Sequence, residues 1–514
     1  MAAMIMVGYE NCFMLIFLCL FSLLCYSLFF KKPKNGFDLP PSPPFIPIIG
    51  HFHLLLSIPT HKSLQKLSSK YGPLLHLRIF NIPVVIVSSA SIAYEIFKTQ
   101  DLNVSSRGPT LIDDPIFAGS SSFISSPYGD HWKFMKKLLV TKLLGPQALV
   151  RSRQNRAYEL ERFYTSLLDK AMKEERVEIY KDVMNLSTKS ICKMIMGRSC
   201  SEENGEKEIF KNLASDSNSL GDKILLGNMS RAPFRKLLMS LFKKERMVVS
   251  KRFDDLFERI LVEHEEKQQQ GTDLMDALLA AYRDDNAVYK ITRNHIKTLL
   301  ADLLFAAPES SAQATQWAMA EIINNPKIHK RLREEIDSVV GKTRLIQESD
   351  VPNLPYLQAV VKEVLRLHPP ATLFGRKSEA ELRIGKFYVP EHTSVIVNVY
   401  AVMRDPDSWE DPDEFKPQRF LASSISSSGQ EDERREQALK YLPFGSGRRA
   451  CPGANLAYVF LETTVGMMVQ GFNWRINGDK VDTEETGLGL ALTMVHPPKF
   501  TLVVRTLNPL TFNL

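Results

Sequence analysis

One stretch near the C-terminus, LPFGSGRRACPGANLAY from Leu442 to Tyr458, limits most strongly what this chain can fold into. It fits the pattern F-x-x-G-x-R-x-C-x-G, with five positions in register: Phe444, Gly447, Arg449, Cys451 and Gly453. Glycines let the backbone approach a flat partner, and nearby positive charge and the N-terminus of a following helix favour a thiolate. A lone cysteine is more often a buried structural residue. Five positions in fixed register instead favour a thiolate ligand for iron.

Composition limits the class of protein. The chain has 514 residues, of which 44% are hydrophobic and 24% are charged, as is typical of a globular protein with a large core. The net charge of +7 is spread along the chain, so we expect no nucleic acid partner and interpret the excess as favouring a membrane surface or an acidic partner. The six cysteines are too few and too irregular for a disulfide framework or a zinc site, which predicts a reduced, cytosolic body.

An uncharged run of 19 residues, Cys12 to Phe30, predicts a membrane anchor. At about 1.5 Å per residue, such a helix reaches roughly 30 Å, the thickness of a bilayer core. A cleavable signal peptide is the alternative, but the run is long and no small-residue cleavage site follows it. Lysines follow the run and only Glu10 precedes it, which predicts a cytosolic body. We predict an anchor at residues 1–32, a proline-rich hinge at 33–50 and a catalytic domain at 51–514.

Periodicity predicts a mainly helical fold with small β-sheets, an α+β class. Tyr71 to Ser89 is expected to form two strands, and helices are expected to dominate from about Ala90 to Leu367. Short strand-like runs such as SVIVNVY follow, separated by turns rich in proline and aspartate.

Two further motifs precede the cysteine loop. KEVLRLHPP carries Glu363 and Arg366 as E-x-x-R, and FKPQRF supplies Arg419. An isolated E-x-x-R is a weak signal, because charge pairs three residues apart are common on solvated helix faces. In this order before Cys451, however, the motifs resemble those of the cytochrome P450 family, plant microsomal type. The amino-acid sequence is similar to those of a group of crucifer enzymes associated with triterpenoid tailoring.

The resemblance implies the cytochrome P450 fold and a monooxygenase that uses haem b (heme), with Cys451 as the axial iron ligand. NADPH would act through a separate partner, NADPH-cytochrome P450 reductase. In the family, residues matching Glu363, Arg366 and Arg419 form a buried ion-pair network. The residues expected at the haem propionates are Trp132, Lys136, Arg376 and Arg449, because two carboxylates in a dry pocket need paired cations.

The helix expected to activate oxygen departs from the family pattern A-G-x-[DE]-T-[TS]. In ADLLFAAPESSAQATQW, Ala307 stands at the glycine position, Pro308 follows, and Ser310 replaces threonine after Glu309. The resemblance implies that Glu309 and Ser310 are the catalytic acid and alcohol that relay protons. Pro308 is predicted to remove a backbone hydrogen bond and to kink the helix.

The resemblance also suggests an apolar substrate pocket, although each of its residues could equally be ordinary core. The residues expected to line it are Phe117, Phe123, Leu304, Ala307, Leu373, Phe374 and Met494. We therefore expect hydroxylation or another oxidation of a lipophilic triterpenoid alcohol or diol at the endoplasmic reticulum membrane, with the body in contact with membrane lipid. Four alternatives stay open: carbon–carbon cleavage of a triterpenoid diol, a flavonoid or phenylpropanoid substrate, a reductase-independent peroxide-rearranging haem-thiolate enzyme, and a non-catalytic haem protein.

Overall fold

The computed structural model describes residues 38–505, apart from 48, 56–58, 81, 108–121, most of 200–231, 267–272, 288, 422–439 and 487–490. The predicted anchor, residues 33–37 and 48 of the predicted hinge, and Phe117 lie outside the described residues. Within the described part of the chain, no helix combines the length and the apolar character needed to span a membrane.

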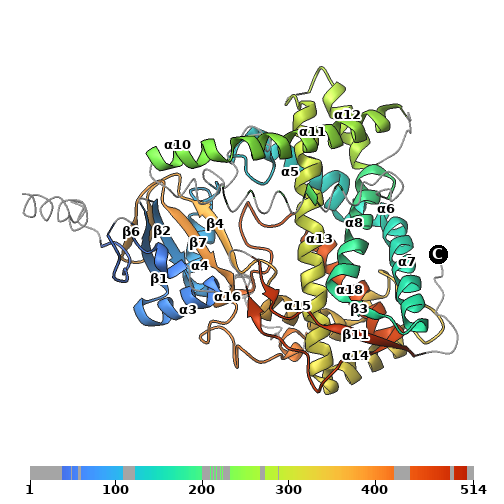
Figure 1. Cartoon of the computed structure of the whole chain (residues 1–514). Helices are drawn as coiled ribbons and strands as arrows, with labels where there is room; N and C mark the ends of the chain where they lie inside the picture. The colour runs from blue at the N-terminus through green and yellow to red at the C-terminus, as the bar shows by residue number, and fades with distance from the viewer. Residues whose placement is uncertain are drawn as a thin grey trace, which may run out of the picture.

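A four-stranded sheet forms one side of the molecule (Figure 1). Its order is β1 (Leu74–Ile79), β2 (Ile82–Val87), β7 (Ser394–Asn398) and β4 (Leu373–Lys377). The β1–β2 and β4–β7 pairs are antiparallel and β2–β7 is parallel. Both faces are covered, because Val85 and Val87 belong to one apolar cluster while Val84 and Ile86 belong to another. The prediction of two strands between Tyr71 and Ser89 is confirmed.

Helices make up the rest of the body. The long helix α13 (Arg293–Asn324) runs through the middle of the molecule (Figure 1). The other helices are α2 (Phe52–Leu55), α3 (Thr60–Tyr71), α4 (Ala90–Thr99), α5 (Asp130–Leu139), α6 (Pro146–Arg151), α7 (Arg153–Met172), α8 (Ile179–Met196), α10 (Ala232–Leu241), α11 (Lys243–Glu266), α12 (Leu274–Arg283), α14 (Pro326–Val339), α15 (Pro355–Leu367), α16 (Val399–Val402) and α18 (Ala454–Gly471). Short π or 3₁₀ turns are η3 (Val140–Leu144), η4 (Val351–Asn353) and η5 (Pro417–Phe420). The largest apolar cluster joins α7, α8, α13, α15 and α18.

Three small sheets complete the fold. One has the order β3 (Arg176–Glu178), β11 (Lys499–Val504) and β8 (Phe472–Arg475), and the two others pair β5 (Leu382–Ile384) with β6 (Phe387–Val389) and β9 (Glu485–Thr486) with β10 (Thr493–Met494). The prediction of a mainly helical fold with small sheets is confirmed.

Helix α13 is continuous across Pro308. Its N-terminus is fixed by a capping box, in which Thr292 accepts from the backbone of His295 and the His295 side chain accepts from the backbone of Thr292. Pro308 has no N–H to donate to the carbonyl of Leu304, so one hydrogen bond is missing within an otherwise regular helix.

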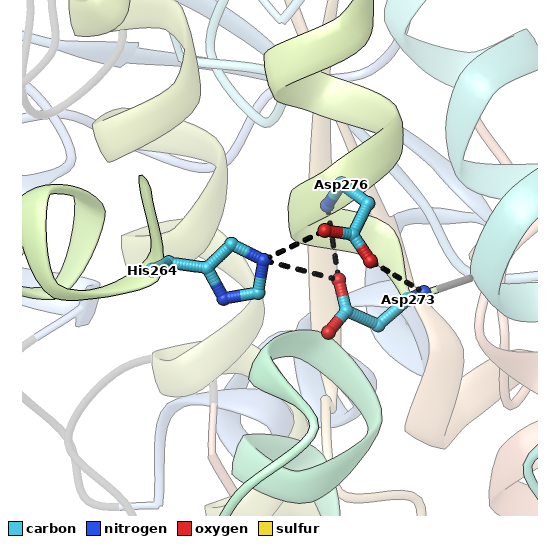
Figure 2. A group of neighbouring side chains, drawn as sticks. All are labelled: His264, Asp273 and Asp276. Carbon is cyan, nitrogen blue, oxygen red and sulfur yellow. Dashed lines mark hydrogen bonds and ion pairs between the residues drawn. The ribbon is translucent and has the colours of Figure 1, made fainter. Parts of the chain in front are cut away.

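A second capping box begins α12 (Figure 2). Asp273 accepts from the N–H of Asp276 at 2.9 Å, and His264 on α11 lies 2.9 Å from an Asp276 oxygen. Burial raises the pKa of Asp273 to about 6. The cap and the histidine account for the contacts of both carboxylates, so we interpret the cluster as a clamp between α11 and α12.

One sequence prediction needs correction. Cys192, a fully buried residue of α8, is disulfide-bonded, although we expected a thiol.

Candidate active site

The cysteine loop is held in place by its own backbone. The N–H of Cys451 donates to the Phe444 carbonyl at 2.9 Å, and the N–H of Ala450 donates to the Gly447 carbonyl at 3.1 Å. Gly447 has a φ of 71°, and a Cβ there would lie 2.1 Å from a carboxylate oxygen of Asp101. Only glycine fits this position, which explains its place in the motif.

The side chain of Cys451 is exposed, yet surrounding protein raises the pKa of its thiol by desolvation. The backbone N–H of Gly453 and the charge of Arg107 lower that pKa only in part. The expected donors and positive charge therefore favour the thiolate, and burial opposes them. A bound metal ion would deprotonate the thiol.

Three of the predicted propionate partners lie together. The Arg449 guanidinium lies over the ring of Trp132, 4.5 Å from its centroid, and Lys136 Nζ lies 4.9 Å from the same centroid. Arg449 Nε donates to the Ser105 carbonyl at 2.7 Å, and Lys136 Nζ donates to the Arg448 carbonyl at 2.6 Å. Two cations, Lys136 from α5 and Arg449 from the cysteine loop, therefore lie against the ring of Trp132.

Arg376 on β4 and Arg107 extend this cationic group. Burial, followed by the charges of Arg107 and Arg449, lowers the pKa of Arg376 to about 9. Burial and the charge of Arg107 lower the pKa of Arg449 to about 10. Each shift means that positive charge is crowded and poorly hydrated. The group therefore favours an anion with more than one carboxylate. Sequence reasoning missed Arg107.

Glu309 and Ser310 hydrogen-bond to different partners on α13. Burial raises the pKa of Glu309, which accepts from Gln313 Nε2 at 3.3 Å, whereas Ser310 Oγ donates to the Ala306 carbonyl at 3.0 Å. Burial, with the charge of Glu309, raises the pKa of Tyr180 on α8 to about 12. The charge of Glu309 therefore reaches Tyr180 on the neighbouring helix α8. The sequence did not predict that Tyr180 lies near Glu309.

Asp302 is a second carboxylate that sequence reasoning missed. Its oxygens accept from Ser122 Oγ at 3.0 and 2.9 Å and from the Ile124 N–H at 3.2 Å. Burial raises its pKa to about 6, although these hydrogen bonds act in the opposite direction. Asp302 therefore ties the segment before α5 to α13. A single carboxylate within the apolar run LLADLLFAA was the available signal.

Glu363, Arg366 and Arg419 also come together. Glu363 Oε1 accepts from Arg419 Nε at 3.0 Å and from the Lys416 N–H at 2.8 Å, in addition to its pair with Arg366. The network joins α15 to η5.

The described residues of the expected substrate pocket are divided among several parts of the core. Phe123 stacks on Trp132, with ring centroids 5.6 Å apart, in the apolar cluster that includes Leu304 and is contacted by Ala307. Three others belong to or pack against different clusters: Leu373, Phe374 and Met494. The structure thus groups Phe123, Leu304 and Ala307 more closely than the rest.

Comparison with known proteins identifies the family. A profile described as Cytochrome P450 matches residues 40–504. The chain belongs to the cytochrome P450 family. Two Arabidopsis thaliana proteins, Cytochrome P450 705A22 and Cytochrome P450 705A5, are 60% and 62% identical to it, over 100% and 99% of this chain and all of each relative.

More distant plant and animal P450s also match. The 3,9-dihydroxypterocarpan 6A-monooxygenase of Glycine max is 35% identical over 94% of this chain and 97% of that protein. A zebrafish cytochrome P450 solved with abiraterone has a TM-score of 0.70 and 24% identity, and covers 87% of this chain and 100% of its own; this likeness supports the fold. The chain is therefore a plant P450 monooxygenase.

The site fits the cofactor of the family. Cytochromes P450 use haem with thiolate-ligated iron and electrons delivered from NADPH by a reductase. In this P450 the cysteine side chain is exposed, and the nearby cations Arg376 and Arg449 have lowered pKa values. Iron would stabilise the thiolate, and two propionates would compensate the cations.

Proposed function

We propose that Cys451 is the axial iron ligand of this P450 and that the cations around Trp132 hold the haem carboxylates. The observation that carries this proposal is the exposed side chain of Cys451, whose thiol is desolvated by surrounding protein and influenced by the charge of Arg107. Bound haem supplies the oxygen-activating chemistry. The residues of this chain position the haem, limit water and supply protons, for which Glu309 and Ser310 are our candidates.

Cys451→Ser tests the ligand assignment. This variant should lose the red-shifted Soret band of the ferrous carbonyl complex and all NADPH-dependent turnover. Cys192→Ala removes the other sulfur of a described cysteine and should keep the band, even if breaking the disulfide lowers stability. A thiolate-type spectrum in the Cys451→Ser variant would contradict the assignment.

For the substrate, we propose a triterpenoid alcohol or diol that is hydroxylated or otherwise oxidised. The apolar side chains of Phe123, Leu304 and Ala307, which lie in or against one apolar cluster, support a lipophilic substrate. Co-expression with a plant reductase and triterpene cyclases, followed by metabolite profiling, tests this. A new oxidised triterpenoid that requires both NADPH and Cys451 is the expected result.

The same experiment separates the other candidates. The similarity to the pterocarpan monooxygenase favours a phenolic polycycle as the second substrate class, so flavonoids belong in the same panel. The substitutions at Ala307, Pro308 and Ser310 favour carbon–carbon cleavage as a second reaction, which would give a shortened product. Turnover without NADPH would indicate peroxide rearrangement.

We also propose that the body is attached to the cytosolic face of the endoplasmic reticulum membrane. The uncharged run at 12–30 supports an anchor, and α10 and α11, which lie across one end of the body in Figure 1, carry an exposed apolar group with lysines among it. That group comprises Leu237, Leu241, Met247 and Val248, with Lys243, Lys244 and Lys251 nearby. Such a surface suits the interface of an anionic membrane. In this topology the sequons at Asn103, Asn185 and Asn228 should stay unglycosylated, and a glycosidase-sensitive mass shift would contradict it.

A further inference from the structure

A cavity of about 200 Å³ lies among α7, α8, α18 and the segment around Glu348. These helices are grouped on the side of the molecule away from the four-stranded sheet (Figure 1). The cavity shares no lining residue with the candidate active site. Its lining includes Ala157, Leu160, Leu186, Ser190, Phe460 and Thr464, with Arg153, Gln154, Arg156, Gln347, Glu348 and Thr463.

The inner wall is apolar but contains one unpartnered hydroxyl. Leu160, Leu186 and Phe460 are among its apolar lining residues, and all three are buried. Thr464 is fully buried, and among the described residues its Oγ1 has no hydrogen-bond partner. Because an unsatisfied buried hydroxyl is unfavourable, an occupant that offers one polar atom is favoured.

The opening of the cavity carries net positive charge. Buried Arg156 binds Glu348 through two hydrogen bonds, Nε at 2.6 Å and Nη2 at 2.8 Å. Arg153 lies at 3.8 Å from the same carboxylate, and its side chain is 46% exposed. Two guanidinium groups therefore face one carboxylate at this opening. The second guanidinium can bind an anionic group, preferably a planar carboxylate.

The volume limits the size of the occupant. A cavity of about 150 Å³ in another protein binds benzene, so about 200 Å³ accommodates one substituted ring but not a polycyclic terpenoid. An apolar wall, a buried hydroxyl and a cationic opening match an aromatic ring with a carboxylate at one end and a hydroxyl at the other.

We propose that this cavity binds a small hydroxylated aromatic carboxylic acid, independently of the haem site. The ring packs on Leu160, Leu186 and Phe460, the carboxylate pairs with Arg153, and the ring hydroxyl satisfies Thr464. The occupant bridges α7 and α18. Because α18 begins three residues after Cys451, the site is connected to the cysteine loop through a single helix.

The test uses full-length, haem-loaded protein and 4-hydroxybenzoate as the probe. Calorimetry and the melting temperature report binding, because a ligand of the folded state raises the melting temperature. The Soret band reports any entry into the haem site. We expect one binding site, a higher melting temperature and an unchanged Soret band.

Three variants locate the probe. Arg153→Gln should weaken binding about tenfold or more, because it removes a charge-assisted pair. Ala157→Trp should abolish binding by filling the cavity, and Thr464→Val should weaken 4-hydroxybenzoate more than benzoate. Arg151→Gln, which removes an exposed charge from the neighbouring helix α6, is the matched control and should change nothing.

Two results would overturn the proposal. In the first, binding is unchanged by Arg153→Gln or is accompanied by a Soret shift, which would place the acid elsewhere. In the second, the wild-type protein binds no probe at millimolar concentration, which would mean that water satisfies Thr464. If Ala157→Trp does not fold, Arg153→Gln and its control Arg151→Gln still show whether the probe binds in this cavity.

Discussion

Arg366 donates two hydrogen bonds to Glu363, Nε to Oε2 at 2.8 Å and Nη2 to Oε1 at 2.9 Å, and neither side chain has exposed surface. Arg366 Nη1 also donates to the carbonyls of Met403 at 2.9 Å and Pro412 at 2.7 Å. The pair therefore joins α15 to the segment that leads to η5.

Removing the carboxylate should leave a buried guanidinium uncompensated. Glu363→Ala is expected to lower the free energy of unfolding by about 3–5 kcal/mol, measured by denaturant titration. Glu334→Ala breaks an exposed pair with Lys330 and should change it by less than about 0.5 kcal/mol. Equal effects of the two substitutions would show that the network does not stabilise the fold.

Arg376→Gln should separate haem retention from protein stability. The positive charges of Arg107 and Arg449 contribute to the lowered pKa of Arg376, so removing one cation should leave the haem-free protein as stable or more stable. Haem transfer to apomyoglobin should become about tenfold faster, because a propionate loses its charge-assisted partner. Arg383→Gln, at an exposed position on β5, is the control. An unchanged rate of haem transfer would show that Arg376 does not bind a haem propionate.

Asp302 should make stability depend on pH. Its folded pKa of about 6 lies above the unfolded value of about 3.9, so its contribution is fully present below about pH 4 and is lost as pH rises to about 6. Relative to Asp302→Asn, the wild-type protein should lose on the order of 1 kcal/mol of unfolding free energy between pH 5 and pH 7. Denaturant titration at both pH values measures this. A pH-independent difference between the two proteins would contradict the raised pKa.

The sequence predicted the parts of the molecule that depend on local pattern. Alternating apolar residues predicted β1 and β2, and the spacing of Glu363 and Arg366 placed both on one face of α15. The motif around Cys451 predicted a tight loop, and the positive φ of Gly447 with Asp101 beside it explains why glycine is needed there.

What the sequence did not predict depends on contacts between distant segments. Arg107 joins the cations near Cys451 only because the chain after α4 returns to the cysteine loop, and no local pattern encodes that return. Asp302 pairs with Ser122, 180 positions away in the chain. The desolvation that raises the pKa of the Cys451 thiol could not be predicted either, because it arises from the whole fold and not from the local sequence.

The last prediction concerns Ser310, the position at which α13 departs from the family pattern. Its Oγ donates to the Ala306 carbonyl, so Ser310→Ala should leave haem content and substrate binding nearly unchanged. If Ser310 supplies protons, losing it should slow the proton-transfer step by about 10²-fold, and more peroxide should be released per NADPH consumed. Ser310→Thr should preserve coupling, and Ser311→Ala, at the next position of the same helix, is the matched control. If Ser310→Ala instead maintained or increased a carbon–carbon cleavage product, proton supply by this hydroxyl would not limit the reaction, and cleavage would replace hydroxylation as the favoured chemistry.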